Sequence, residues 1–419
     1  MGNNHRFRYL ASGNDCAKKD NRYGEFTQIC YDNDCFYNAK ALYQTGVTTI
    51  NRLSYMRLQF VTIPLAAISL AFICLSCAKK AENNSSTGPE APPAATVCTA
   101  PGWASQNGGT TGGGSATATV VSTYATLKAA IENKSVKVIQ VSGSITIPSG
   151  GRISFQDQSG KTLFGVPGAR LVSEDQTQNN SGIIYMKRCS NIIIRNLVFE
   201  GAGAYDVDGQ DNMTIDNCSN VWLDHCEFQD GVDGNLDFKN MSDYITATYC
   251  KFSYLKAPRA GGSGGSNDHR FSNLIGSSDD ATGDRGHLRI SFIRCWWAPG
   301  CVARMPRVRF GKVHVVNSYF NSTVSSSCVQ AGFEADILVE ANVFENVKRP
   351  IDLMSNNSTA VQEKNNIFIS VTGNTAGNGV NAFAPPYTLN TLDNSAVKAA
   401  VTGSTGAGAT LTGNSCTNL

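Results

Sequence analysis

The sequence predicts an all-β protein, a right-handed parallel β-helix with a short N-terminal capping helix. From about residue 120 onward, short β-rich runs alternate with clusters of Asn, Asp, Gly and Ser, which are typical of tight bends. Many of these runs share one pattern, in which apolar residues alternate and an aromatic residue closes the run. The closing residues are Phe199, Phe228, Phe252, Trp297, Phe320, Phe344 and, in a weaker copy, Phe368.

The closing aromatic residues recur with a regular period. Successive ones lie 29, 24, 45, 23, 24 and 24 residues apart, a spacing that indicates a solenoid. We expect the 45-residue interval to hold two turns, the middle one at HRFSNLIGSS (269–278). Each turn is expected to contribute one strand, whose inward residues are buried only when turns stack. A β-sandwich is the alternative, since it also contains many short strands.

One segment alone has helical periodicity. In STYATLKAAIEN (122–133), Leu127, Ala130 and Ile131 lie at helical spacing. We expect this helix to cap the open end of the stack and to cover its edge strands.

Residues 56–77 form a predicted export signal. Arg57 supplies a basic start, and an apolar run of roughly 16 residues follows, shorter than the ~20 of a membrane span. Ser76 and Cys77 resemble a bacterial lipoprotein cleavage site. We therefore expect an exported bacterial protein, either an outer-membrane lipoprotein or a secreted one. An uncleaved anchor or a plain secretory signal is the alternative.

The other boundaries follow from this signal. Because an export signal acts at the N-terminus, residues 1–55 are predicted to be a non-native extension from a mis-assigned start. Residues 78–97 are polar and rich in Ser, Pro and Ala, which predicts a flexible linker. The folded domain is predicted to span residues 98–419.

Charge and cysteine content limit the function classes. The 419 residues hold 35 Lys+Arg and 33 Asp+Glu, a balance that argues against a nucleic-acid partner. The 14 cysteines exceed what a reduced cytosol usually tolerates, which favours export. Cys226 with Cys250, and Cys98 with Cys416, are candidate disulfides, and buried free thiols are the alternative.

An acidic segment predicts a metal site. Asp211, Asp233 and Asp237 lie on successive turns. Stacked turns are about 4.8 Å apart, so carboxylates at matching positions converge on one face. Such an oxygen-rich cluster would bind a hard cation, with calcium favoured. Solvated turn aspartates are the alternative.

A basic segment, CVARMPRVRFGKVHVVNSYF, follows later in the chain. Arg304 and Arg309 differ in strand parity, so a bend at Pro306 is needed for both to face one groove. Arginines on such a face clamp carboxylates through paired hydrogen bonds, and a solvated basic edge is the alternative. The strand pair Asp224 and His225 lacks an accompanying nucleophile, so we favour a structural role over acid–base chemistry.

At this point the sequence resembles a known family. VWLDHCEF, DGNLD, LIGSSDD and RMPRVRFGKVHVVNSYF occur in the same order as in the pectate lyases of polysaccharide lyase family 1. The resemblance extends from about Thr119 through Phe344, and more weakly to the end. It implies a parallel β-helix and calcium-dependent cleavage of α-1,4-linked polygalacturonate. The implied reaction is a β-elimination that leaves 4,5-unsaturated oligogalacturonides.

The resemblance also implies residue roles. Arg304 would be the base that removes the proton beside the uronate carboxyl group, and Arg309 would bind a substrate carboxylate. Asp211, Asp233 and Asp237 would hold calcium, which bridges to the uronate. An arginine is an unusual base because its pKa lies above ~12, so the role requires a locally cationic site and favours alkaline operation.

One position departs from the family pattern. Many relatives have a substrate-contacting Lys five residues before the Gly of the LIG segment, where this chain has Phe271. Arg270 is a candidate substitute, although a one-residue offset on a strand points to the opposite face. Related pectin lyases cleave methyl-esterified pectin and lack the calcium site, so the intact aspartates favour the unesterified polymer. A non-catalytic β-helix that binds acidic polysaccharide is the other alternative. We expect a monomer that contacts a membrane only through its lipid anchor.

Overall fold

The computed structural model describes residues 27–31, 34–38, 99–355 and 357–413. The chain divides into two units, Met1–Ser86 and Thr87–Leu419. In the first unit, β1 (Thr27–Tyr31) pairs antiparallel with β2 (Asp34–Asn38). The predicted signal (56–77) and linker (78–97) lie outside the described residues, as does most of 1–55, so these assignments stay predictions. In the described part of the chain, no helix is long and apolar enough to cross a membrane.

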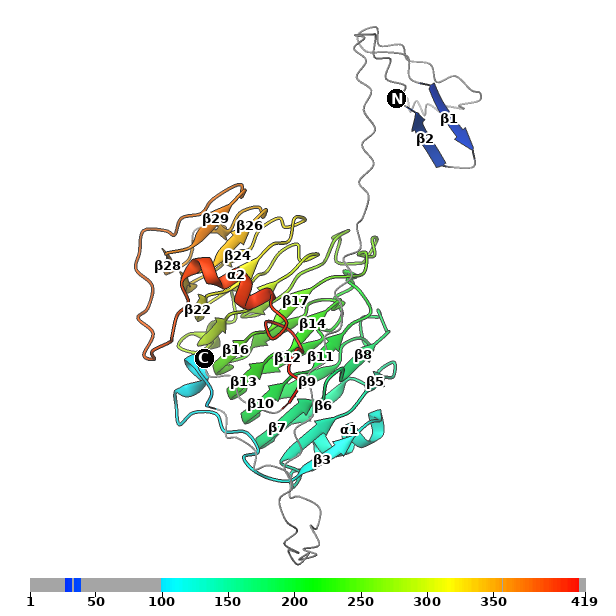
Figure 1. Ribbon diagram of the computed structural model, residues 1–419, viewed down its shortest axis with the longest axis vertical. Helices are drawn as coiled ribbons and strands as arrows, with labels where there is room; N and C mark the ends of the chain where they lie inside the picture. The colour runs from blue at the N-terminus through cyan, green and yellow to red at the C-terminus, as the bar shows by residue number, and fades with distance from the viewer. Residues whose placement is uncertain (1–26, 32–33, 39–98, 356, 414–419) are drawn as a thin grey trace, which may run out of the picture. The chain divides into compact units, whose positions relative to one another are not determined.

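The second unit is a right-handed parallel β-helix built from three parallel sheets (Figure 1). In spatial order, the first sheet contains β3 (Ala118–Val121), β4 (Val138–Val141), β7 (Ser159–Gly165), β10 (Ser190–Arg195), β13 (Ser219–Asp224), β16 (Asp243–Thr248), β19 (Ile290–Ile293), β22 (Lys312–Val316), β25 (Asp336–Glu340) and β28 (Ala360–Lys364).

The other two sheets follow the same order along the stack. The second sheet contains β5 (Ser144–Ile147), β8 (Arg170–Ser173), β11 (Val198–Glu200), β14 (Glu227–Gln229), β17 (Lys251–Ser253), β20 (Trp296–Trp297), β23 (Tyr319–Phe320), β26 (Val343–Glu345) and β29 (Ile367–Ile369). The third sheet contains β6 (Ile153–Gln156), β9 (Ile184–Lys187), β12 (Met213–Asp216), β15 (Leu236–Lys239), β18 (Leu274–Ile275), β21 (Arg307–Val308), β24 (Val329–Ala331) and β27 (Ile351–Asp352).

Two sequence-based expectations about the turns are wrong. A full turn contributes three strands, one to each sheet, rather than one. The 45-residue interval is a single turn, because Lys251 pairs directly with Trp296, and Phe252 with Trp297. Its extra length lies in the two loops that flank β18. Aromatic spacing alone cannot distinguish an inserted loop from an additional turn.

The repeated aromatic residues form one continuous stack inside the helix, which is consistent with the predicted stacking of turns. Neighbouring rings in the series lie near-parallel with centroids 4.3 to 5.7 Å apart. The parallel register places equivalent residues of successive turns opposite each other, as in the pairs Phe199 with Phe228 and Phe320 with Phe344. Offset stacking of this kind adds to the burial energy of each ring.

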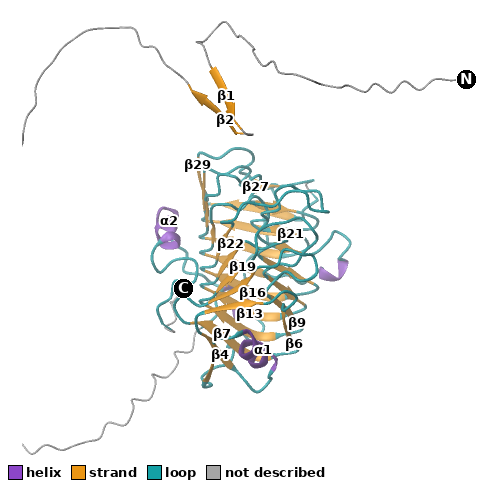
Figure 2. Cartoon of the chain, turned by 90° about the vertical axis from the view of Figure 1, so that its right-hand side faces the viewer, coloured by secondary structure: helices purple, strands orange, loops and turns teal. Residues whose placement is uncertain are grey.

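The predicted capping helix is present as α1 (Tyr124–Glu132). It contacts β3, β4, β5 and β6 at one end of the stack (Figure 2). Thr123 closes its N-terminus with a capping box. The fully buried Lys161 donates from Nζ to the carbonyl oxygens of Ala130, Ile131 and Asn133, so a cation satisfies the C-terminal end of the helix.

A second helix, α2 (Asn394–Thr402), was not expected from the sequence. Asp393 caps its N-terminus, and Val397 and Val401 are buried in a small cluster with Tyr319 and Val343 of the second sheet. The helix is short and few of its residues face the core, so the helical pattern is weak. Its position depends on packing against β23 and β26 rather than on local periodicity. The described residues also contain the 3-10 turns η1 (Gly102–Ser105) and η2 (Thr282–Asp284).

The candidate disulfide between Cys226 and Cys250 is not formed, and both residues are free buried thiols. Each thiol instead points at a main-chain carbonyl, with Cys226 Sγ 3.6 Å from Ile194 O and Cys250 Sγ 3.7 Å from Leu223 O. Burial raises the pKa of both thiols well above its ordinary value. They therefore pack as small apolar residues, which was the alternative reading. Cys98 and Cys416 lie outside the described residues.

Candidate active site

The third sheet brings the predicted acidic and basic residues to one face. Thr214 of β12 lies opposite Asp237 of β15, and Leu274 of β18 lies opposite Arg307 of β21. The Leu274 N–H donates to Asp237 Oδ1 at 2.9 Å, which continues the row from β15 to β18. Residues far apart in sequence thus share one row because parallel strands stack in register.

Asp211 and Asp237 converge as predicted. A Cβ placed on Gly234 would lie 2.8 Å from Asp211 Oδ1 and 3.1 Å from Asp237 Oδ1, so both oxygens face the same small space. Asp211 Oδ2 accepts a hydrogen bond from Thr214 Oγ1 at 2.7 Å. Asp211 Oδ1 is buried and has no hydrogen-bond partner among the described residues. Only a glycine at this position leaves the two carboxylates room to approach.

The electrostatics of this pair favour a cation. Burial, and then the charge of Asp233, raise the pKa of Asp211. Burial and the charge of Asp211 raise the pKa of Asp237 well above its ordinary value, while the charge of Arg304 acts in the opposite direction. Two buried carboxylates with an unpaired oxygen are the donors that a hard cation such as calcium takes, so the residues present fit that ion.

Asp233, the third predicted ligand, has a different partner. Its Oδ1 lies 2.9 Å from Nε2 of His269, whose Nδ1 lies 3.3 Å from Asp206 Oδ1. Neither ring nitrogen makes a well-aligned hydrogen bond among the described residues. Within the described residues, no three His, Cys, Asp or Glu side chains already form a metal site. Sequence reasoning missed His269, which has no distinguishing local pattern.

Arg304 lies beside the acidic pair. The backbone turns sharply at this residue, with φ at +56°, and its N–H donates to Gln330 Oε1 at 2.9 Å. Its guanidinium carbon lies 4.6 Å from the ring centre of Phe271. This turn lies at Arg304 itself, two residues before Pro306, where the sequence had placed the bend.

Arg309 and Arg307 complete a basic group next to Arg304. Arg309 is largely buried, and its Nε donates to Asp279 Oδ1 at 2.6 Å while its Nη1 donates to Gly276 O at 3.1 Å. Burial, and then the charges of Arg309 and Arg304, lower the pKa of Arg307. The three guanidinium groups therefore lie close enough to repel one another, as a site for polyanions requires.

The structure brings Phe271, rather than Arg270, to Arg304. Arg270 is paired with Asp268, its Nε 2.7 Å from Oδ1. Phe271 forms an isolated bridge with Ala303, the residue before Arg304. This agrees with the expectation that a one-residue offset reverses the face, and a substrate-binding role for Arg270 stays a prediction.

Asp224 and His225 have the structural role favoured from the sequence. Both are buried at the end of β13 in the first sheet, and Asp224 contacts Arg195 Nε at 2.6 Å, His225 Nδ1 at 2.8 Å and Thr248 Oγ1 at 2.6 Å. Burial tends to raise the pKa of Asp224, but these partners outweigh it and lower the pKa. The pair therefore anchors strands of the first sheet.

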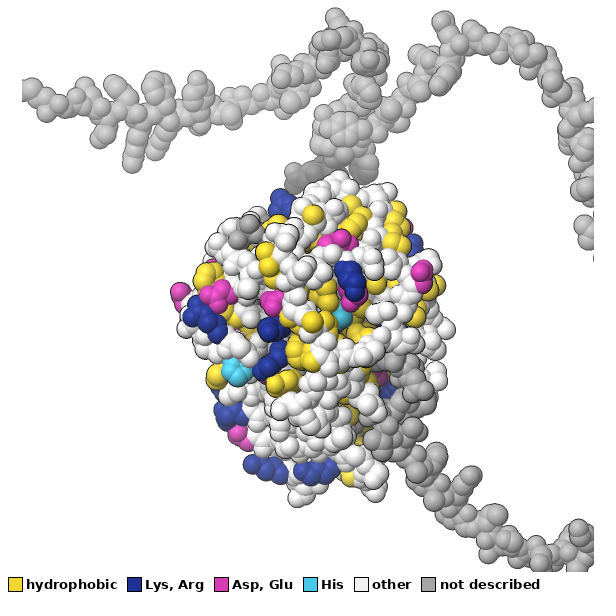
Figure 3. All heavy atoms as spheres, turned by 90° about the vertical axis from the view of Figure 1, so that its left-hand side faces the viewer, with side chains coloured by type: hydrophobic (Ala, Val, Ile, Leu, Met, Phe, Trp, Pro, Cys, Tyr) yellow, Lys and Arg dark blue, Asp and Glu magenta, His cyan; other side chains and the backbone are white. Residues whose placement is uncertain are grey.

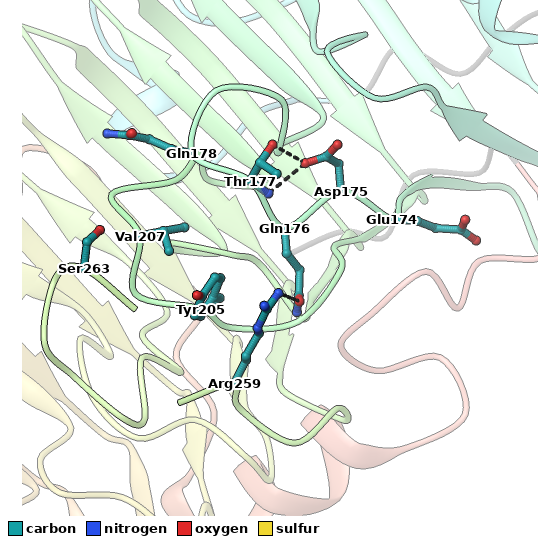
Figure 4. A pocket seen from close by; sticks show the side chains of 9 residues that line it. All are labelled: Glu174, Asp175, Gln176, Thr177, Gln178, Tyr205, Val207, Arg259 and Ser263. Atoms are coloured by element: carbon teal, nitrogen blue, oxygen red, sulfur yellow. Dashed lines mark hydrogen bonds between the residues drawn. The ribbon is translucent and has the colours of Figure 1, made fainter. Parts of the chain in front are cut away.

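A cavity of about 600 Å³ lies between the loops that follow β8, β11 and β17 (Figure 4). The guanidinium carbon of Arg259 lies 4.2 Å above the Tyr205 ring, and Nη1 contacts Gln176 Oε1 at 3.4 Å. Glu174 and Asp175 also line the cavity, so its charges are mixed and do not select one ligand class. The arginine and aspartate groups described above are not part of its lining.

The surface charge is mixed on a larger scale as well. On the face shown in Figure 3, Lys and Arg side chains are interspersed with Asp and Glu, without a continuous field of one sign. Positive charge is therefore not spread as one field over that face.

Comparison with known proteins identifies the family of this chain. A family model described as pectate lyase matches residues 90–410. A probable pectate lyase A of Neosartorya fischeri is 33% identical over 314 residues, which cover 73% of this chain and 87% of the relative. Pectate lyase E of Dickeya chrysanthemi is 34% identical over 285 residues, which cover 58% of this chain and 69% of the relative.

Solved structures show the same fold. The pectate lyase pelN of Paenibacillus sp. 0602 superposes with a TM-score of 0.61 at 20% identity, covering 76% of this chain and 97% of that one. A pectate lyase bound to a hexasaccharide gives a TM-score of 0.60 at 23% identity, covering 76% and 99%. From the family match, the similar relatives and the fold, we conclude that this chain belongs to the pectate lyase family and is a lyase.

Proposed function

We propose that this protein is a calcium-dependent pectate lyase that cleaves α-1,4-linked polygalacturonate by β-elimination. One observation carries the proposal. On the third sheet, the convergent carboxylates of Asp211 and Asp237 lie next to the cationic group of Arg304, Arg307 and Arg309. Binding of an acidic polymer uses both the aspartate pair and the arginine group. A cation can bridge a polymer carboxylate to the aspartates, while the arginines bind neighbouring carboxylates directly.

The acidic pair would hold calcium, with Asp233 as a further ligand. When bound, calcium would neutralise the uronate carboxylate and so make the neighbouring C–H bond more acidic. Asp211 and Asp237 favour such an ion because their charges are buried and mutually repulsive. Arg309 is held by Asp279 and by Gly276 O, so its remaining N–H groups can orient a substrate carboxylate.

Arg304 is the proposed base. It would take the proton from C5 beside the carboxylate, and the electrons of that bond would form the C4–C5 double bond. The C4–O bond would then break, and the glycosidic oxygen would leave with its electron pair and gain a proton. A guanidine accepts a proton only in its neutral form, so we expect activity to be highest at alkaline pH.

The test is the ultraviolet absorbance of unsaturated uronates during incubation with polygalacturonate. We expect a rise that needs calcium and is lost on chelation, and Arg304→Ala should abolish it while the thermal midpoint stays near that of the wild type. Arg285→Ala, at an exposed arginine paired with Glu334, is the matched control and should remain active.

Each alternative has its own outcome in the same assay. Activity on methyl-esterified pectin that survives chelation would favour a pectin lyase. Binding of polygalacturonate without any rise in absorbance would favour a non-catalytic β-helix. Retained turnover in Arg304→Ala would remove this residue as the base.

A further inference from the structure

The side chain of Arg304 rests on an aromatic ring. Its guanidinium carbon lies 4.6 Å from the ring centre of Phe271, within the range of a cation–π contact. The bridge between Phe271 and Ala303 sets this distance, because it aligns the phenylalanine with the residue next to Arg304 on the adjacent turn.

Arg304 differs from Arg309 and Arg270 in its charged partners. Arg309 is paired with Asp279, and Arg270 with Asp268. Among the residues that the structure describes, no carboxylate lies within ion-pair distance of the Arg304 guanidinium, and its hydrogen bond to Gln330 comes from the main chain. The ring of Phe271 is therefore a direct side-chain contact of this head group, which also lies within the electrostatic range of Asp237.

The phenyl ring of Phe271 also contacts a second ring, that of His269. The His269 ring lies 4.3 Å from that of Phe271, tilted by 52°. His269 in turn lies between the carboxylates of Asp206 and Asp233. A chain of contacts thus runs from the acidic cluster through two rings to Arg304, so the guanidinium is positioned relative to Asp233.

We propose that Phe271 is a positioning residue for Arg304 in the lyase reaction, and the inference rests on the function proposed above. The phenyl face attracts the guanidinium and restricts it to one side of the ring. Phe271 thereby fixes the base without adding charge, and it acts through Arg304 rather than on the substrate.

The test compares Phe271→Leu, which removes the ring but keeps an apolar side chain, with Phe271→Tyr and Phe271→Trp, which keep an aromatic face. We expect Phe271→Leu to lower kcat about tenfold, equivalent to ~1.4 kcal/mol, with KM changed less than about twofold. The two aromatic variants should retain most of the wild-type kcat. Phe383→Leu, at a partly buried phenylalanine packed on Trp103, is the control for losing a ring elsewhere.

A second measurement does not depend on turnover. Modification of Arg304 by phenylglyoxal, followed by peptide mass spectrometry, should be several-fold faster in Phe271→Leu than in the wild type and unchanged in Phe271→Tyr. Exposed Arg285 serves as the internal reference. Equal modification rates at Arg304 in all variants would overturn the positioning role. A wild-type protein without turnover would refute the proposed function, while the modification experiment would still decide whether Phe271 holds Arg304.

An unchanged kcat in Phe271→Leu would also overturn the proposal. Equal losses in Phe271→Leu and Phe271→Tyr would do the same, because they would point to packing at this position rather than to the aromatic face. Thermal unfolding of each variant identifies losses that come from an unstable fold.

Discussion

Replacing Asp237 with asparagine should stabilise the calcium-free protein and remove its response to calcium. Asp237 is 7% exposed, and its Oδ1 accepts a hydrogen bond from the Leu274 N–H. Asparagine can keep that bond through its own Oδ1 while removing a buried charge that faces Asp211. The variant therefore changes charge with almost no change in shape.

The sign of the effect follows from the pKa. Burial and Asp211 raise the folded-state pKa of Asp237 above its unfolded value, more than the charge of Arg304 lowers it. The contribution of the Asp237 carboxyl group to the free energy of unfolding is therefore fully present below its ordinary pKa of about 4. This contribution is lost as the pH rises through the folded-state pKa. At pH 7, which lies above the ordinary pKa, this carboxyl group therefore opposes folding, and we expect Asp237→Asn to gain roughly 1–3 kcal/mol.

Urea unfolding at pH 7, with chelator or with excess calcium, measures both parts of this prediction. Calcium at 100 times its dissociation constant should stabilise the wild type by about 2.7 kcal/mol and the variant by far less. Asp216→Asn is the matched control, because this buried carboxylate of β12 already accepts hydrogen bonds from Tyr185 and Asn240. That control should lose stability. An Asp237→Asn protein that is less stable than the wild type in chelator would refute the reasoning.

Two further predictions concern a histidine and a glutamate. His269→Asn should weaken calcium binding in calorimetry about 10- to 100-fold, because it removes the group that contacts Asp233, and unchanged affinity would exclude this role. Glu340 is held by His314 first and then by Lys364, which lower its pKa to about 2. Stability from Glu340 is therefore present above its unfolded pKa of about 4.5 and is lost as pH falls towards 2. Urea unfolding between pH 5 and 2 should show a smaller loss in Glu340→Gln, and equal losses would contradict this.

Local patterns in the chain anticipated much of the fold. The aromatic series from Phe199 to Phe368 predicted stacked turns, and those rings form the continuous internal stack. Leu127 and Ile131 predicted the capping helix, since both lie on its buried face. These features depend on residues close in sequence or on a repeat, so the pattern itself contains the information.

The sequence predicted which residue types form the site better than it predicted how those residues contact one another. The convergence of Asp211 and Asp237 followed from stacking of successive turns. The partners of Asp233 and Arg304 could not be predicted in this way. His269 and Phe271 reach them from a loop whose path no local pattern specifies. The length of that loop was itself mistaken for an additional turn.

By itself, the sequence determined the repeat, the inward aromatic residues and the residue types available for acid, base and metal chemistry, because strand alternation and period are properties of the chain. Tertiary structure decided that a turn has three strands, that Cys226 and Cys250 stay free thiols, and that Phe271 rather than Arg270 meets Arg304. These outcomes depend on which side chains from distant segments fill the same space, and burial and charge pairing settle that competition only once the chain has folded.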